Sequence, residues 1–136
     1  MPTPPVTNIY SVYTIMSSNS ISLPISITNQ NKENVETLTL IDSGAGGKFI
    51  NRKYAEQQKF PVLNLEKPIM PRNVDGTINK SGAITTYVDI PLTVDGQTLD
   101  TWLLVTELGN QKVILGYPWL QEHNPDIDWQ TGRFRW

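Results

Sequence analysis

Carboxylates are the only side chains of this sequence that could carry hydrolytic chemistry. The 136 residues include no cysteine and one histidine, His123. This composition excludes a disulfide scaffold, a cysteine nucleophile and a zinc finger or knuckle. A serine hydrolase would need His123 as its base, but Glu122-His123-Asn124-Pro125 is typical of a helix end, where histidine supports the last carbonyls. Gly-x-Ser-x-Gly, phosphate-loop and dinucleotide-binding motifs are also absent.

Asp42-Ser43-Gly44-Ala45 is the segment best suited to use a carboxylate. The largely apolar residues 38–41 precede it, so Asp42 is expected in a poorly solvated position. The Ser43 hydroxyl can hydrogen-bond a neighbouring loop, and Gly44 and Ala45 allow another backbone to approach closely. Taken alone, these four residues equally fit an ordinary turn after a strand.

Length and charge restrict the other function classes. The chain is long enough for one domain with one core. Lys plus Arg number 11 and Asp plus Glu 13, giving a net charge of -2, so we expect no nucleic-acid partner. No apolar run is long enough to span a bilayer, and the first residues lack the features of a signal peptide. We therefore expect no membrane association and a cytoplasmic location.

The pattern of apolar residues predicts a mostly-β domain over residues 20–136. Strands are predicted at 20–27, 35–41, 88–94, 98–105 and 112–115, short helices at 52–58 and 118–122, and hairpins around Asp95-Gly96 and Gln130-Thr131-Gly132. Asn51 is expected to cap the first helix. A proline-bounded loop is predicted at 68–71, before a long hairpin at 73–88. Residues 1–19 are interpreted as a leader or linker, with a strand at 9–16 as the alternative.

Three motifs in order give the chain its resemblance to the aspartic proteases of retroviruses and long-terminal-repeat retrotransposons, closest to the gypsy type. They are Leu40-Ile41-Asp42-Ser43-Gly44-Ala45, then Asn73-Val74-Asp75-Gly76, then Val113-Ile114-Leu115-Gly116-Tyr117-Pro118-Trp119-Leu120 with His123-Asn124-Pro125. The resemblance covers about residues 20–129. It implies a retropepsin-like, closed or partly open β-barrel with one or two short helices and one lobe per chain.

The resemblance also implies a mechanism in which two aspartates share a proton and activate water against a peptide bond. The chain has one Asp-Ser-Gly, so we expect a symmetric homodimer in which each subunit gives Asp42 to one site. The expected catalytic residues are Asp42, Ser43 and Gly44. No metal or organic cofactor is required. The expected substrate is a polypeptide, the parent polyprotein of a retroelement, processed in the cytoplasm or within virus-like particles.

Further roles follow from the same resemblance. Ser43 would lock the two active loops together, Gly44 would contact the substrate backbone, and Ala45 would shape a subsite wall. The expected substrate-binding residues are Ala45, Gly46, Asp75, Gly76, Thr77, Ile78 and Gly82, the last five in a flap over the peptide. Many relatives carry a polar residue where this chain has Gly46-Gly47, and the flap apex, Ile78-Asn79-Lys80, is less glycine-rich than in retroviral enzymes.

Two other interpretations fit the sequence. The first is a catalytically inactive protease-like domain that dimerises or binds peptides, which would not depend on the Asp42 carboxylate. The second is an unrelated β-barrel binding domain, which would be a monomer. Trp102, Trp119 and Trp129 are interpreted as core or interface packing residues, with a role as binding platforms as the alternative.

Overall fold

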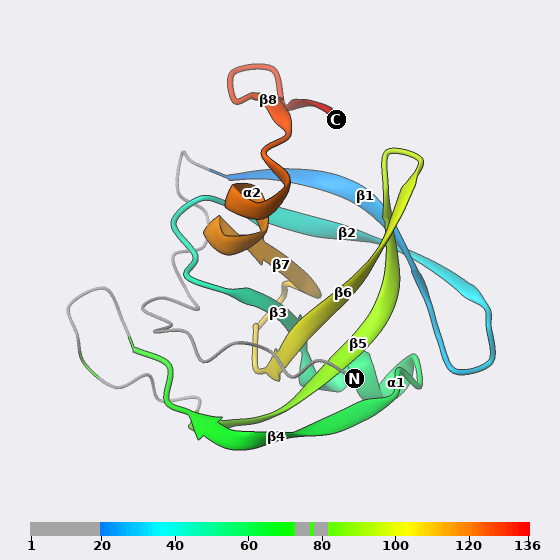
Figure 1. The fold of residues 1–136 in the computed structure, drawn as a ribbon, viewed down its shortest axis with the longest axis vertical. Coiled ribbons are helices and arrows are strands. Elements are labelled where there is room, and N and C mark those ends of the chain that lie inside the picture. The colour runs from blue at the N-terminus through cyan, green and yellow to red at the C-terminus, as the bar shows by residue number, and fades with distance from the viewer. Residues whose placement is uncertain (1–19, 73–76, 78–81) are drawn as a thin grey trace.

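The computed structural model describes residues 20–72, 77 and 82–136, so the predicted leader at 1–19 lies outside the described residues. Strands dominate this part of the chain, and two short helices accompany them (Figure 1). The elements are β1 (Ser20–Thr28), β2 (Asn34–Asp42), β3 (Lys48–Asn51), α1 (Arg52–Gln57), β4 (Val62–Ile69), β5 (Ile84–Val94), β6 (Gln97–Thr106), β7 (Val113–Gly116), α2 (Tyr117–His123), β8 (Asp126–Asp128) and β9 (Arg133–Arg135).

Six strands close into a barrel in the order β1-β2-β7-β3-β6-β5, because β5 pairs back onto β1. Strand β4 adds to β5 outside this ring, and β8 and β9 form a separate two-stranded sheet. The short β7 is parallel to β2 and antiparallel to β3. The prediction of a mostly-β barrel with short helices is confirmed.

Two hairpins follow the sequence pattern closely. Strands β1 and β2 pair along their whole length, from Ser20 opposite Asp42 to Thr28 opposite Asn34. Between β5 and β6, Asp95 and Gly96 have φ angles of 45° and 79°, and positive φ at both central residues is what a two-residue type I′ hairpin turn requires. The first hairpin therefore fixes the position of Asp42 at a strand end.

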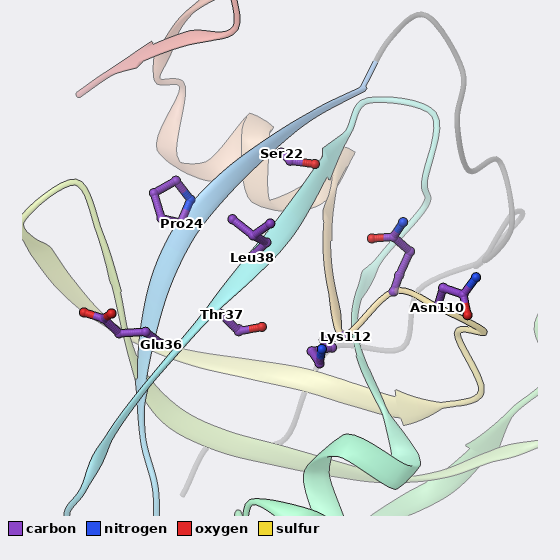
Figure 2. A pocket seen from close by; sticks show the side chains of 8 residues that line it. Ser22, Pro24, Glu36, Thr37, Leu38, Asn110 and Lys112 are labelled. Carbon is purple, nitrogen blue, oxygen red and sulfur yellow. The ribbon is translucent and has the colours of Figure 1, made fainter.

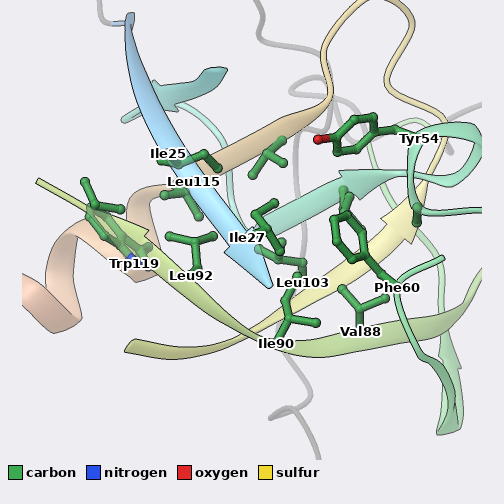
Figure 3. Close-up of a cluster of buried hydrophobic side chains, with 14 of the residues drawn as sticks. Ile25, Ile27, Tyr54, Phe60, Val88, Ile90, Leu92, Leu103, Leu115 and Trp119 are labelled. Carbon is green, nitrogen blue, oxygen red and sulfur yellow. The ribbon is translucent and has the colours of Figure 1, made fainter. Parts of the chain in front are cut away.

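The barrel interior is filled by apolar side chains from every strand of the ring (Figure 3). Ile25 and Ile27 of β1 alternate inward, and Trp119 of α2 is fully buried in the same cluster. A second buried cluster contains Leu40, Ala45, Phe49, Ile69, Ile84, Tyr87, Leu104, Leu108 and Ile114. Because neighbouring residues of a strand face opposite sides, Ile41 belongs to the interior cluster and Leu40 to the second one.

Aromatic side chains join the C-terminal hairpin to the barrel. Trp136 donates its indole N–H to the carbonyl of Val94 at 2.8 Å. Its ring contacts those of Phe134, His123 and Trp119. This contact positions β8 and β9 beside α2.

Three local predictions need correction. The loop predicted at 68–71 begins too early, because β4 continues through Pro68 to Ile69, whose side chain is buried, and only residues 70 and 71 lie outside the strand. Pro68 lies between Asn64 and Ile69, where the pairing of β4 with β5 is irregular. Proline has no backbone N–H, but at this position its absence does not remove a hydrogen bond from the regular part of the sheet. Strand β3 was not predicted. The cap predicted at Asn51 is also wrong. Asn51 precedes α1, but its side chain makes no hydrogen bond to the first turn of the helix, and its side-chain amide donates to the Gly109 carbonyl at 3.2 Å instead.

Candidate active site

Asp42 is the last residue of β2 and is held from both sides by the sheet. Its backbone lies opposite Ser20 of β1 and Gly116 of β7. The side chain projects from the same face of β2 as Leu40 and is fully buried. The rigid strands, rather than a loop, therefore set where the carboxylate lies.

The two carboxylate oxygens of Asp42 differ in their surroundings. Oδ1 accepts a hydrogen bond from the Gly44 amide at 2.9 Å. Oδ2 is buried, and no polar group of the described residues lies within hydrogen-bonding distance of it. Burial raises the pKa of Asp42 above its usual 3.8, and the Gly44 amide opposes this effect. Oδ2 is thus the atom available to hold a proton or a reacting molecule.

The loop after Asp42 is fastened to the start of α2. The Ala45 amide donates to the Asp42 carbonyl at 3.1 Å, which closes the turn. Gly116 donates to the Gly47 carbonyl at 2.9 Å and Tyr117 to the Ala45 carbonyl at 2.8 Å. A Cβ at Gly116 would collide with the carbonyls of Gly47 and Ala45. Only glycine allows this close backbone approach.

The structure brings together the predicted residues of the Asp42 loop. Gly44 is exposed, Ser43 and Gly46 are half-buried, and Ala45 is buried in the second apolar cluster. Ser43 also borders a groove of about 510 Å³, whose other lining residues are Tyr117, Leu120, Gln121, Asn124, Pro125, Asp126, Ile127 and Trp129.

The predicted flap is described only in part. Asp75, Gly76 and Ile78 lie outside the described residues, as does half of the predicted hairpin at 73–88. Thr77 is exposed, and Gly82 has a φ of 87°, which favours glycine.

Sequence reasoning missed the residues that support the loop from behind. A Cβ at Gly47 would lie 2.7 Å from Cζ of Phe49, so this buried ring packs directly on the loop backbone. Lys48 is buried with its Nζ 3.8 Å from the centroid of the Trp102 ring. Burial lowers the pKa of Lys48, while the carboxylates of Glu122 and Asp89 oppose this effect. The only signal in the sequence is a lysine that directly precedes the apolar pair at 49–50.

The tryptophans differ in their packing. Trp119 is fully buried and Trp102 is half-buried beneath Lys48, as packing residues should be. Trp129 is 40% exposed and borders the groove beside Ser43.

Residues 20–72, 77 and 82–136 contain no cluster of three or more His, Asp or Glu side chains that could hold a metal ion. In this same part of the chain, neither helix is long and apolar enough to cross a membrane.

Comparison with known proteins identifies the family to which this domain belongs. The sequence model of the PEG10/RTL1 protease domain matches residues 38–136, which include Asp42, the barrel from the second half of β2 onward and both helices. The chain belongs to the PEG10/RTL1 protease domain family. The match extends over most of the chain, and the resemblance to retroviral and gypsy-type retrotransposon proteases is confirmed.

Solved structures show the same fold. The retroviral protease-like domain of Ddi1 from Leishmania major superimposes with a TM-score of 0.55 at 19% identity, over 79% of this chain and 78% of that chain. EIAV protease, solved in complex with the inhibitor HBY-793, superimposes with a TM-score of 0.53 at 16% identity, over 85% of this chain and 97% of that chain. The fold is therefore retropepsin-like.

Proposed function

We propose that this domain is an aspartic endopeptidase that acts as a homodimer, with Asp42 of each subunit in one shared site. The observation that carries the proposal is the asymmetry of the buried Asp42 carboxylate. Oδ1 is held by the Gly44 amide, and Oδ2 has no hydrogen-bonding group of the described residues within reach. A buried carboxylate that is fixed through one oxygen and has no hydrogen-bond partner at the other is suited to hold a proton and to pass it to a reacting group.

In the proposed reaction, two Asp42 side chains share one proton. The ionised Asp42 takes a proton from water as the water oxygen attacks the peptide carbonyl carbon, and the protonated Asp42 donates its proton to the carbonyl oxygen. Burial, which raises the pKa of Asp42, favours retention of that proton. The two groups titrate as a coupled pair.

The groove beside Ser43 supports association of two chains. Tyr117 and Trp129 line it with 54% and 40% of their surfaces exposed, an unusual exposure for large aromatic side chains. A second chain covering them would bring its own Ser43 and Asp42 to the same axis. The resemblance to retroelement proteases supports the parent polyprotein as the substrate, and the cytoplasm or virus-like particles as the place of processing.

Cleavage of an unstructured protein by the purified chain tests the proposal. Asp42→Asn should abolish cleavage, whereas Asp100→Asn, which changes an exposed aspartate of β6 in the same way, should not. Specific activity should rise with enzyme concentration, because the monomer has half a site. If the folded and dimeric wild type cuts nothing between about pH 4 and 8, the inactive protease-like module is the correct reading.

A further inference from the structure

A groove of about 580 Å³ opens on the barrel wall where β2 and β7 part (Figure 2). Strand β2 pairs with β1 along its whole length, but with β7 only from Thr39 to Asp42. Among the described strands, none pairs with this second edge of β2 over residues 34–38. We call this stretch the free edge of β2. A free strand edge offers backbone N–H and C=O groups to another extended segment.

The free edge of β2 lacks the features that usually protect an edge strand. Strand β4, at the end of the seven-stranded sheet, carries Glu66, Lys67 and Pro68. Charges and proline discourage pairing with a further strand. Residues 34–38 of β2 read Asn-Val-Glu-Thr-Leu, with one charge and no proline. The free edge of β2 is therefore able to pair with an added strand.

An exposed apolar patch lies beside the free edge. Leu38 of β2 and Pro24 of β1 are opposite each other in the sheet, and Figure 2 shows their side chains together. Leu38 is 59% exposed, more than any other large apolar side chain among the described residues. Ser22, two residues before Pro24, is exposed as well. The outer surface of both strands is therefore open to a segment that crosses it.

The charges at the groove favour an uncharged occupant. Glu36 and Lys112 both line the groove, so their formal charges cancel. The Nζ of Lys112 lies 5.7 Å from the centroid of the Tyr54 ring, which already attracts this cation. Symmetric pairing of two free edges over residues 34–38 would place Glu36 directly opposite the partner's Glu36, and like charges in that position are unfavourable. A neutral segment avoids this repulsion.

The chain has an uncharged segment with strand character ahead of β1. Residues 1–19 include no Asp, Glu, Lys or Arg. Within them, residues 9–16, Ile-Tyr-Ser-Val-Tyr-Thr-Ile-Met, are a strand in one interpretation of the sequence, and they lie outside the described residues. Six of the eight are β-branched or aromatic, the types that favour strands. This segment matches the free edge in charge and in strand propensity.

The segment is long enough to reach the free edge. Ser20 begins β1 and lies opposite Asp42, four residues from Leu38. Four residues correspond to about 13 Å along the strand, and two strand spacings add about 10 Å across it, so the direct distance is about 16 Å. Six extended residues span about 20 Å, which allows Thr14 to lie beside Leu38. A segment that enters from the Asp42 end would run parallel to β2, as β7 does.

We propose that residues 9–16 add to the free edge of β2 as a parallel strand within the same molecule. Their backbone pairs with residues 34–38, and Ile15 and Met16 cover Leu38 and Pro24, which removes apolar surface from water. The added strand continues the wall that the short β7 leaves open. It also closes an edge at which other extended chains could pair. The inference does not depend on whether Asp42 cleaves peptides.

Engineered cysteines test this pairing, because the chain has no cysteine of its own. Glu36→Cys lies on the free edge and leaves the apolar patch intact. Adjacent strands hold paired residues within the Cα separation that a disulfide requires. Glu66→Cys, which changes an exposed glutamate of the edge strand β4, is the matched control. Each is combined in turn with one of four further substitutions: Ser11→Cys, Val12→Cys, Tyr13→Cys or Thr14→Cys.

We expect disulfides within one molecule from Glu36→Cys at alternate positions only, either 12 and 14 or 11 and 13, because neighbouring residues of a strand face opposite sides. Non-reducing gels and mass spectrometry at low protein concentration measure them. Equal yields at all four positions, equal yields with Glu66→Cys, or no disulfide at all overturns the inference. Disulfides formed only between two molecules also overturn it, since the free edge would then receive a second copy. In the wild type, hydrogen exchange should show protected amides within residues 10–14, and complete exchange within seconds contradicts the added strand.

Discussion

The contact between Gly116 and the Asp42 loop allows a quantitative prediction for Gly116→Ala. Gly116 has φ and ψ of -96° and -164°, an extended conformation that alanine adopts without strain. The cost of the substitution is therefore purely steric. The new Cβ would collide with the carbonyl oxygens of Gly47 and Ala45 and lie 2.9 Å from the Ala45 carbonyl carbon. All three atoms belong to the backbone, so no side-chain rotation relieves the collision.

The expected loss combines two effects. Moving the loop weakens the hydrogen bonds from Gly116 to Gly47 and from Tyr117 to Ala45, each worth about 1 kcal/mol. Overpacking of a buried site adds about 1–3 kcal/mol. We expect Gly116→Ala to lower the free energy of unfolding by about 3 kcal/mol or more, a large part of the roughly 5–15 kcal/mol of a typical domain.

Urea unfolding followed by tryptophan fluorescence measures this loss, with Gly132→Ala as the control. Gly132 has a φ of 74°, and a Cβ added there would meet open space, so its replacement adds backbone strain of about 1–2 kcal/mol without a collision. If Gly116→Ala is no less stable than Gly132→Ala, the loop is not held against β7 and α2 as described.

Three further predictions concern titration and turns. Burial raises the pKa of Asp42 above 3.8, so its contribution to stability is lost as the pH rises through the folded-state pKa. Asp42→Asn should therefore gain stability relative to wild type as the pH rises above 3.8 in urea unfolding, and a constant difference would contradict this. Burial lowers the pKa of His123 below 6.5, so stability falls as the pH drops below 6.5. His123→Gln should reduce this fall in thermal denaturation, and an unchanged pH profile would reject the assignment. Gly96→Ala, at a φ of 79°, should cost about 1–2 kcal/mol in the same unfolding assay, and an unchanged midpoint would refute the turn geometry.

The sequence predicted those strands and turns that are determined by residues close together in the chain. Period-two alternation indicated β1 and β2, and Asp95-Gly96 indicated the β5–β6 hairpin. Strand β3 gives no such signal, because all four of its residues are buried and alternation is absent. Its place between β6 and β7 depends on partners more than fifty residues away. Strand β4 was hidden by Pro68, which the irregular pairing with β5 accommodates.

The candidate site was predictable to a similar degree. Asp42 and the residues after it were identified from the motif, and the structure describes their geometry in one tight turn. The support behind the loop could not be derived from local spacing. Only glycine fits at position 116, because a Cβ there would collide with the backbone carbonyls of Ala45 and Gly47, which lie about seventy positions earlier in the chain. Leu38 looked like one more apolar residue of a strand until the short length of β7 left it uncovered.

Burial of Asp42 links association, protonation and activity in the proposed enzyme. Burial already raises the pKa of a single Asp42 and so shifts this carboxylate toward its protonated form. A second Asp42 brought to the same axis would add the repulsion of two like charges, so the pair holds one proton more firmly than either chain alone. Formation of the dimer would then take up a proton at any pH between the pKa of Asp42 in the single chain and the higher pKa of the pair, so lowering the pH in that range would favour both association and the protonation state that cuts. Dependence on enzyme concentration and preference for acid are therefore expected to be two consequences of one buried side chain.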